Sequence, residues 1–185
     1  MQLKTILALL PLVATSLGYV VPEGTPDGFY AVTFDDHGNA TTHEVDPTTL
    51  VTIGDSLEKR GFVQRSAKHL ARRQTPGSHG STGGTFPNHN DYNQCTIGWN
   101  NFWAADNFIP ARTIFYASSG QAVLAGCNYQ RVAFWTPRSV SMTDVFNGFM
   151  DANVGYWKTG WAHFNSGQDF THWRDLQGTA ICTNL

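Results

Sequence analysis

The chain has 185 residues, a formal net charge of −2 and only 14% charged residues. This length allows one domain, or one domain with an appendage. The near-neutral charge excludes a strongly basic nucleic-acid-binding protein, so no nucleic-acid partner is expected.

The first eighteen residues have the order of a secretory signal peptide. Lys4 supplies a positive charge, the run 5–13 is apolar, and Ser16 and Gly18 are small residues at a cleavage position. The apolar run is about half the length that crosses a bilayer, and no later run approaches that length. We therefore expect residues 1–18 to be removed and the rest to be secreted without a membrane span.

Residues 19–73 are expected to be a prosegment, because composition changes abruptly near residue 74. All three glutamates precede that point, and all six tryptophans and three cysteines follow it. The segment contains two basic pairs, Lys59-Arg60 and Arg72-Arg73. We expect a dibasic-specific processing protease to bind and cleave the chain at these pairs. Cleavage after the second pair is favoured by the polar, Gly/Ser-rich chain that follows it.

The prosegment itself contains a predicted hairpin. Residues 28–34 alternate like a strand, 35–39 have turn chemistry, and 41–45 return as the second strand. The prosegment would then be a small folded cap or chaperone. Asn39 begins an Asn-Ala-Thr sequon in the turn, which predicts a glycoprotein.

Residues 74–91 are rich in Gly, Ser, Thr, Asn and His and have no apolar periodicity, which predicts a flexible linker. Residues 92–185 are expected to form a small α+β domain, an antiparallel sheet with two helices on one face. Such a small domain needs additional stabilisation, here from tryptophans and a disulfide.

Local patterns place the elements of this domain. The spacing predicts a helix over 95–107, capped by Asn93 and ended by Pro110, and then a hairpin around Ser118-Ser-Gly120. Its strands are 113–117 and 121–129. A capping-box pattern at Ser141-Met-Thr-Asp144 begins a helix that runs to about Asn153. Val145, Phe146 and Phe149 are its predicted buried stripe. Strands over 157–164 and 179–183 end the domain.

Three cysteines leave one thiol over after a pair forms. Cys127–Cys182 would join two strands. Cys95–Cys182 would join the two ends of the domain, and the long loop it closes slightly favours this pairing. Cys127 would then be the leftover thiol, either buried or bridging two chains in a disulfide-linked dimer. No zinc-type spacing is present, so neither a metal nor a cofactor is expected.

Four polar residues near the end of the chain are the candidates for catalysis. His163, Asp169, His172 and Arg174 could perform acid–base cleavage as in small secreted nucleases. A polar loop over 165–169, flanked by histidines on strand edges, is the favoured explanation of the same residues. No elbow, P-loop or dinucleotide motif occurs. The sequence therefore does not decide whether the protein is an enzyme, and it favours a binding protein.

Most of the tryptophans are expected in the core, where Trp99 and Trp103 are one helical turn apart and Trp157 and Trp161 would share one strand face. Six are many for one small core. Trp135 and Trp173 are the predicted exposed pair, available to stack on a partner.

The segment IPARTIFYASSGQAVLAGCNY at 109–129, the later Gly160-Trp161 and the terminal GTAIC are similar to a broad group of small secreted proteins of ascomycete fungi. The layout also resembles the killer-toxin α/β sandwich, whose members carry more cysteines. These resemblances imply a fungal source and a virulence-related effector or toxin-like role.

Three functions follow as hypotheses. The first is a secreted effector or toxin-like protein that binds a host or competitor protein or wall component. The second is a small secreted hydrolase of the nuclease type. The third is a module that binds cell-wall polysaccharide through exposed tryptophans.

Overall fold

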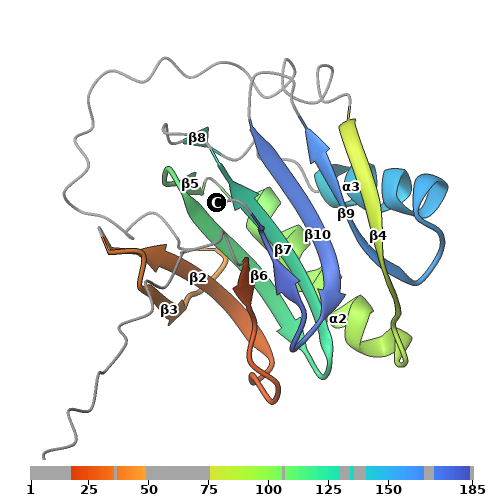
Figure 1. The fold of residues 1–185 in the computed structure, drawn as a ribbon, viewed down its shortest axis with the longest axis horizontal. Helices are drawn as coiled ribbons and strands as arrows, with labels where there is room; N and C mark the ends of the chain where they lie inside the picture. The colour runs from red at the N-terminus through yellow and green to blue at the C-terminus, as the bar shows by residue number, and fades with distance from the viewer. Residues whose placement is uncertain are drawn as a thin grey trace, which may run out of the picture.

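The computed structural model describes residues 18–35, 37–48, 76–105, 107–129, 134–135, 141–164 and 169–183. Among these residues, seven strands form one antiparallel sheet in the order β3-β2-β6-β7-β10-β9-β4 (Figure 1). In that order the strands are Ala40–Glu44, Gly28–Phe34, Thr113–Ser119, Ala122–Asn128, Phe170–Leu176, Lys158–Phe164 and Pro76–Thr85. Two short antiparallel pairs accompany the sheet: β1 (Tyr19–Val20) with β11 (Ala180–Ile181), and β5 (Phe108–Ile109) with β8 (Phe134–Trp135).

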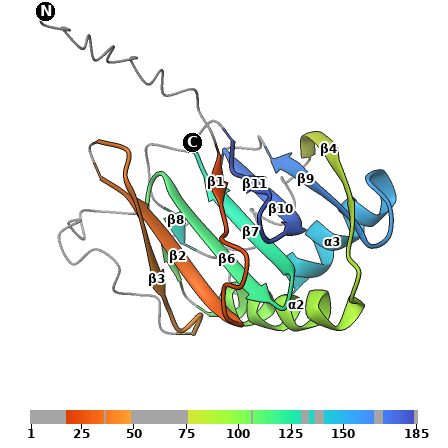
Figure 2. The ribbon, with the colours of Figure 1, turned by 60° about the horizontal axis from the view of Figure 1, so that its bottom comes forward.

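Helices α2 (His89–Ala104) and α3 (Ser141–Asn153) lie on the same side of the sheet (Figure 2). Their buried residues, including Trp99 and Phe146, share one core with the sheet residues of that face. A second cluster, which includes Tyr116 and Trp173, covers the opposite face, and residues in and beside β1 and β11 pack on it. We call these the helix face and the open face. The mixed α+β architecture expected from the sequence is confirmed.

Strict alternation along the strands separates the two faces. In β6, Phe115 and Ala117 belong to the helix-face core, whereas Ile114 and Tyr116 belong to the open-face cluster. Because both sides of the central strands are covered, every residue of β6 and β7 is buried. That double burial explains why these two strands are nearly continuous apolar runs in the sequence.

Several local predictions are confirmed. The β6–β7 hairpin turns at Gly120, which has a φ of +52°. The hairpin expected near residues 28–45 forms as β2 and β3, and the strand expected over 157–164 forms as β9. Helix α3 begins and ends where its capping pattern predicted.

One residue of the predicted buried stripe of α3, Val145, was assigned wrongly. Met142, Phe146 and Met150 are fully buried and Phe149 is half-buried, whereas Val145 is 41% exposed. The buried residues are four apart, so the stripe is centred one position away from Val145.

The flexible linker predicted over 74–91 was also wrong. Residues 76–85 form β4, the edge strand beside β9, and α2 begins at His89 with Asn88, not Asn93, as its cap. The glycines here serve close packing. A Cβ on Gly80 would lie 2.9 Å from the indole nitrogen of Trp161, and one on Gly84 would lie 2.5 Å from Oγ1 of Thr159.

The prosegment and core domain do not separate in the structure. Strand β2 lies inside the sheet, between β3 and β6, and β1 pairs with β11 near the end of the chain. The predicted boundary at residue 92 therefore divides one folded unit. Residues 1–17 of the predicted signal peptide, and the basic pairs Lys59-Arg60 and Arg72-Arg73, lie outside the described residues.

The favoured cysteine pairing was wrong as well. Cys127 of β7 bonds to Cys182, which follows β11, and Cys95 of α2 is free and buried. The two faces explain this outcome: Cys127 and Cys182 belong to the open-face cluster, whereas Cys95 lies in the helix-face core on the other side of the sheet. With Cys95 only 1% exposed, a second chain cannot reach the leftover thiol of the folded protein.

Candidate functional site

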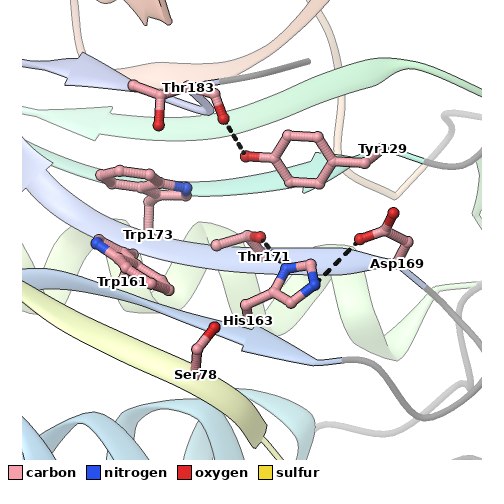
Figure 3. A pocket seen from close by; sticks show the side chains of 8 residues that line it. All are labelled: Ser78, Tyr129, Trp161, His163, Asp169, Thr171, Trp173 and Thr183. Atoms are coloured by element: carbon pink, nitrogen blue, oxygen red, sulfur yellow. Dashed lines mark hydrogen bonds and ion pairs between the residues drawn. The ribbon is translucent and has the colours of Figure 1, made fainter.

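An open pocket of about 440 Å³ lies on the open face, near the end of the sheet formed by β4, β9 and β10 (Figure 3). Its lining combines three large aromatic rings with five polar side chains. The lining residues are Ser78, Tyr129, Trp161, His163, Asp169, Thr171, Trp173 and Thr183.

The pairing of β9 with β10 creates the centre of this pocket. Thr171 lies opposite His163, and Trp173 lies opposite Trp161. Because side chains two residues apart point to the same face, these four residues project together from neighbouring strands. Asp169 comes directly before β10 and completes the group.

His163 is held from both sides of its ring. Its Nδ1 is 2.7 Å from the hydroxyl oxygen of Thr171, and its Nε2 is 3.1 Å from a carboxylate oxygen of Asp169 (Figure 3). The His163 side chain is 25% exposed and that of Asp169 is 53% exposed. Both ring nitrogens are thus engaged and the imidazole orientation is fixed, while the carboxylate still faces solvent.

The indole rings of Trp161 and Trp173 form the aromatic wall of the pocket. Their centroids are 6.1 Å apart and their planes are inclined by 34°. Trp173 is mostly buried, at 5% exposure, whereas Trp161 is half-buried and offers more of its surface. The close approach of Gly80 leaves space for the Trp161 ring at the sheet edge.

Tyr129 closes the side of the pocket next to the chain end. Its hydroxyl donates to the carbonyl of Thr183 at 3.3 Å, and its ring meets the His163 ring edge-on at 6.1 Å. Burial raises the pKa of Tyr129, so the phenol stays protonated and remains a hydrogen-bond donor at neutral pH.

The predicted group of four polar residues divides between the two faces of the sheet. His163 and Asp169 meet in the pocket, but His172 and Arg174 point to the helix face, because they alternate with Thr171 and Trp173 along β10. These two residues therefore cannot act together with His163. Strand β10 itself was not predicted, because polar residues at its buried positions hide the alternation that identifies a strand.

His172 is fully buried between aromatic rings. It stacks on Phe146 at 5.0 Å and tilts against Trp99 at 5.8 Å, and neither ring nitrogen bonds to a described residue. Burial, aided by the positive charge of Arg174, lowers the pKa of His172 to about 3. The imidazole is therefore neutral and serves as a core ring.

This burial predicts acid sensitivity. The unfolded chain protonates His172 near the ordinary pKa of about 6.5, whereas the folded chain resists protonation down to about pH 3. The unfolded state thus binds more protons between these values, and the free energy of unfolding falls as the pH drops through that window. Urea titrations should show about 2 kcal/mol lost through His172 at pH 5 relative to neutral pH.

A His172→Phe variant should lack that part of the pH dependence, because phenylalanine keeps the stacked ring without a titrating nitrogen. Exposed His43, replaced by Phe, is the matched control and should keep the parent slope. An unchanged slope in the His172→Phe variant would contradict the account.

Of the two tryptophans predicted to be exposed, Trp173 lines the pocket but is only 5% exposed, so its predicted exposure was wrong. The side chain of Trp135 lies outside the described residues. Trp161 was missed because it was expected to share a face with Trp157. Instead, Trp157 lies before β9 with a φ of +58° and packs toward the helix face. Two-residue alternation from Trp161 to His163 and from Thr171 to Trp173 was the available signal.

Other predicted features can be placed too. Asn39 is exposed in the turn between β2 and β3, where its amide donates to the Asp35 carboxylate at 2.8 Å. Within the described ranges, no group of three or more His, Cys, Asp or Glu side chains could hold a metal ion. No helix in this part of the chain combines the length and apolarity needed to cross a membrane.

The comparisons with known proteins leave the site to be interpreted from its own geometry. No protein-family model, curated protein or solved structure matches this chain.

Proposed function

We propose that this protein acts outside the cell as a binding protein, and that the pocket around Trp161 and Trp173 binds a saccharide of a cell wall or cell surface. The observation that carries this proposal is the pair of inclined indole rings beside a rim of hydrogen-bonding side chains. The effector or toxin-like role expected from the sequence would be exerted through this binding.

The pocket chemistry supports a neutral, hydroxyl-rich ligand. Indole faces stack on the C–H faces of sugar rings, and the surrounding groups offer both kinds of hydrogen-bond partner. The Asp169 carboxylate accepts hydrogen bonds, the Ser78 hydroxyl can donate or accept, and the Tyr129 oxygen can accept because its hydrogen is donated to the Thr183 carbonyl. A strongly charged ligand has less support, because His163 and Asp169, which contact each other, are the only His, Lys, Arg, Asp or Glu side chains among the described residues that line the pocket.

Hydrolysis is the second candidate, and one observation favours it. Thr171, His163 and Asp169 form a hydrogen-bonded series of hydroxyl, imidazole and carboxylate, with contacts of 2.7 and 3.1 Å. A nucleophile, a base and an orienting acid need this order. Thr171 is only 3% exposed, however, which disfavours attack on a polymer and makes binding the better-supported function.

The proposal predicts selective retention on insoluble polysaccharide. The secreted protein should bind chitin or β-glucan, and Trp161→Ala should weaken binding about tenfold or more, as expected for an aromatic binding residue. Depletion assays with purified protein measure both affinities. Tyr156→Ala is the matched control, because this aromatic ring is 73% exposed and is not among the pocket-lining residues.

Equal weakening by the Trp161 and Tyr156 variants, or no binding to either polymer, would contradict the saccharide assignment. RNA and polysaccharide degradation assays on the same samples test the second candidate. Degradation that is lost in His163→Ala would replace binding with hydrolysis as the proposed function.

A further inference from the structure

The segment predicted to be a removable prosegment supplies an interior strand of the sheet. Strand β2 pairs with β6 over five residue positions, from Gly28 opposite Ser118 to Val32 opposite Ile114 (Figure 1). Its other edge pairs with β3. Removal of the segment would therefore expose the whole hydrogen-bonding edge of β6.

The same segment contributes to the hydrophobic clusters on both faces. Phe29 stacks on Phe102 at 5.0 Å in the helix-face core, and Tyr30 stacks on Tyr116 at 4.9 Å on the open face. The apolar side chains of this segment that are no more than 7% exposed are Val21, Phe29, Tyr30, Ala31 and Val32. Such burial is typical of a domain core and not of a detachable cap.

Polar contacts fix the segment at two turns of the later chain. Gln177, after β10, accepts a hydrogen bond from the amide of Gly24 at 2.7 Å and donates to the carbonyl of Thr25 at 2.8 Å. At the β6–β7 turn, the carboxylate of Asp27 accepts from the Ser119 hydroxyl at 3.0 Å and from the Gly120 amide at 2.8 Å.

Both basic pairs fall between the end of β3 at Glu44 and the start of β4 at Pro76. Hydrolysis of the Arg73–Gln74 peptide bond consumes one water and leaves a carboxylate on Arg73 and an amine on Gln74. No strand of the described sheet is interrupted by this cut. All three cysteines follow residue 74, so the disulfide cannot link the two products.

We infer that cleavage at the basic pairs does not release the N-terminal segment. It leaves two chains that share the sheet, and cutting at both pairs also excises residues 61–73. Residues 19–48 stay in place as β1, β2 and β3 and are held without a covalent bond. The interaction surface is the edge of β6 with the side chains on both of its faces, and its partner is this chain's own N-terminal segment. This inference is independent of the saccharide proposal.

The full secreted chain, digested with a dibasic-specific protease, tests the inference. Under native conditions, the two large fragments should elute together, close to the size of the intact protein. On a denaturing gel without reductant, they should separate. A variant with Arg72→Ser and Arg73→Ser, together with Lys59→Ser and Arg60→Ser, is the uncut control and should remain one band.

A matched pair of variants distinguishes a specific interface from nonspecific association of the two fragments. Phe29→Ala should make the cut fragments dissociate at a lower urea concentration, whereas His43→Ala, in the exposed strand β3, should not. Native separation of the cut fragments, whether or not the larger one stays folded, would overturn the inference. Equal effects of the two variants would overturn the assigned interface.

Discussion

Replacing Asp151 with alanine is expected to lower the free energy of unfolding by about 3 kcal/mol, because it leaves the buried charge of Arg174 without its carboxylate. The Arg174 side chain is 1% exposed, and its Nη1 lies 2.6 Å from an Asp151 carboxylate oxygen. Its Nη2 also donates to the Gly155 carbonyl at 2.5 Å, but this neutral acceptor cannot compensate the charge.

A second substitution tests that cause. In the double variant Asp151→Ala with Arg174→Met, the unpaired charge is gone, so stability should recover part of the loss. Asp144→Ala is the control on the same helix, since Asp144 is exposed and should cost less than 1 kcal/mol. Urea unfolding measures all four proteins. A double variant that is less stable than Asp151→Ala alone would contradict the explanation.

The disulfide has the other large expected effect. Cys127 and Cys182 are 55 residues apart, and a loop of that length corresponds to about 4 kcal/mol in the chain-entropy model. Cys127→Ala should therefore lower the unfolding free energy by roughly this amount. Adding reductant to the parent should have a similar effect, whereas it should not change the stability of the Cys127→Ala variant.

Alkylation identifies the free thiol and checks the pairing. Burial raises the pKa of Cys95 to about 12, so the thiol should resist alkylation in the folded protein and react once the protein is denatured. Peptide mapping of protein denatured without reductant should find the label on Cys95. A label on Cys127 would restore the pairing of Cys95 with Cys182.

Elements with strong local signals were predictable from the sequence. The glycine turn at 120 and the capping pattern at 141–144 each specify an element without reference to the rest of the fold. Strand β10 was missed for the opposite reason. Its helix-face positions include His172 and Arg174, and polar residues at buried positions hide the alternation that identifies a strand.

Other features depend on contacts between distant segments. The glycines of β4 are typical of a linker in the sequence. Only the fold shows that Trp161 and Thr159 pack against them. The correct disulfide depends on which face of the sheet each cysteine occupies, and cysteine spacing does not contain that information.

The candidate site was only half predictable. His163 and Asp169 were grouped correctly because they are close in sequence and flank one strand connection. Ser78, Tyr129 and Thr183 reach the same pocket from three other parts of the chain, through the pairing of β4 with β9 and through the Cys127–Cys182 disulfide. Sequence proximity also misled, since it grouped His172 and Arg174 with residues on the opposite face.

The most direct test of the saccharide site is an NMR titration that follows the indole N–H signals. Soluble fragments of chitin or β-glucan should shift the signals of Trp161 and Trp173 with a common affinity. Trp99 and Trp103, buried in the helix-face core, are internal controls and should not move. Signals of Trp161 and Trp173 that stay unchanged at high concentrations of both saccharides, in a protein that remains folded, would contradict the account.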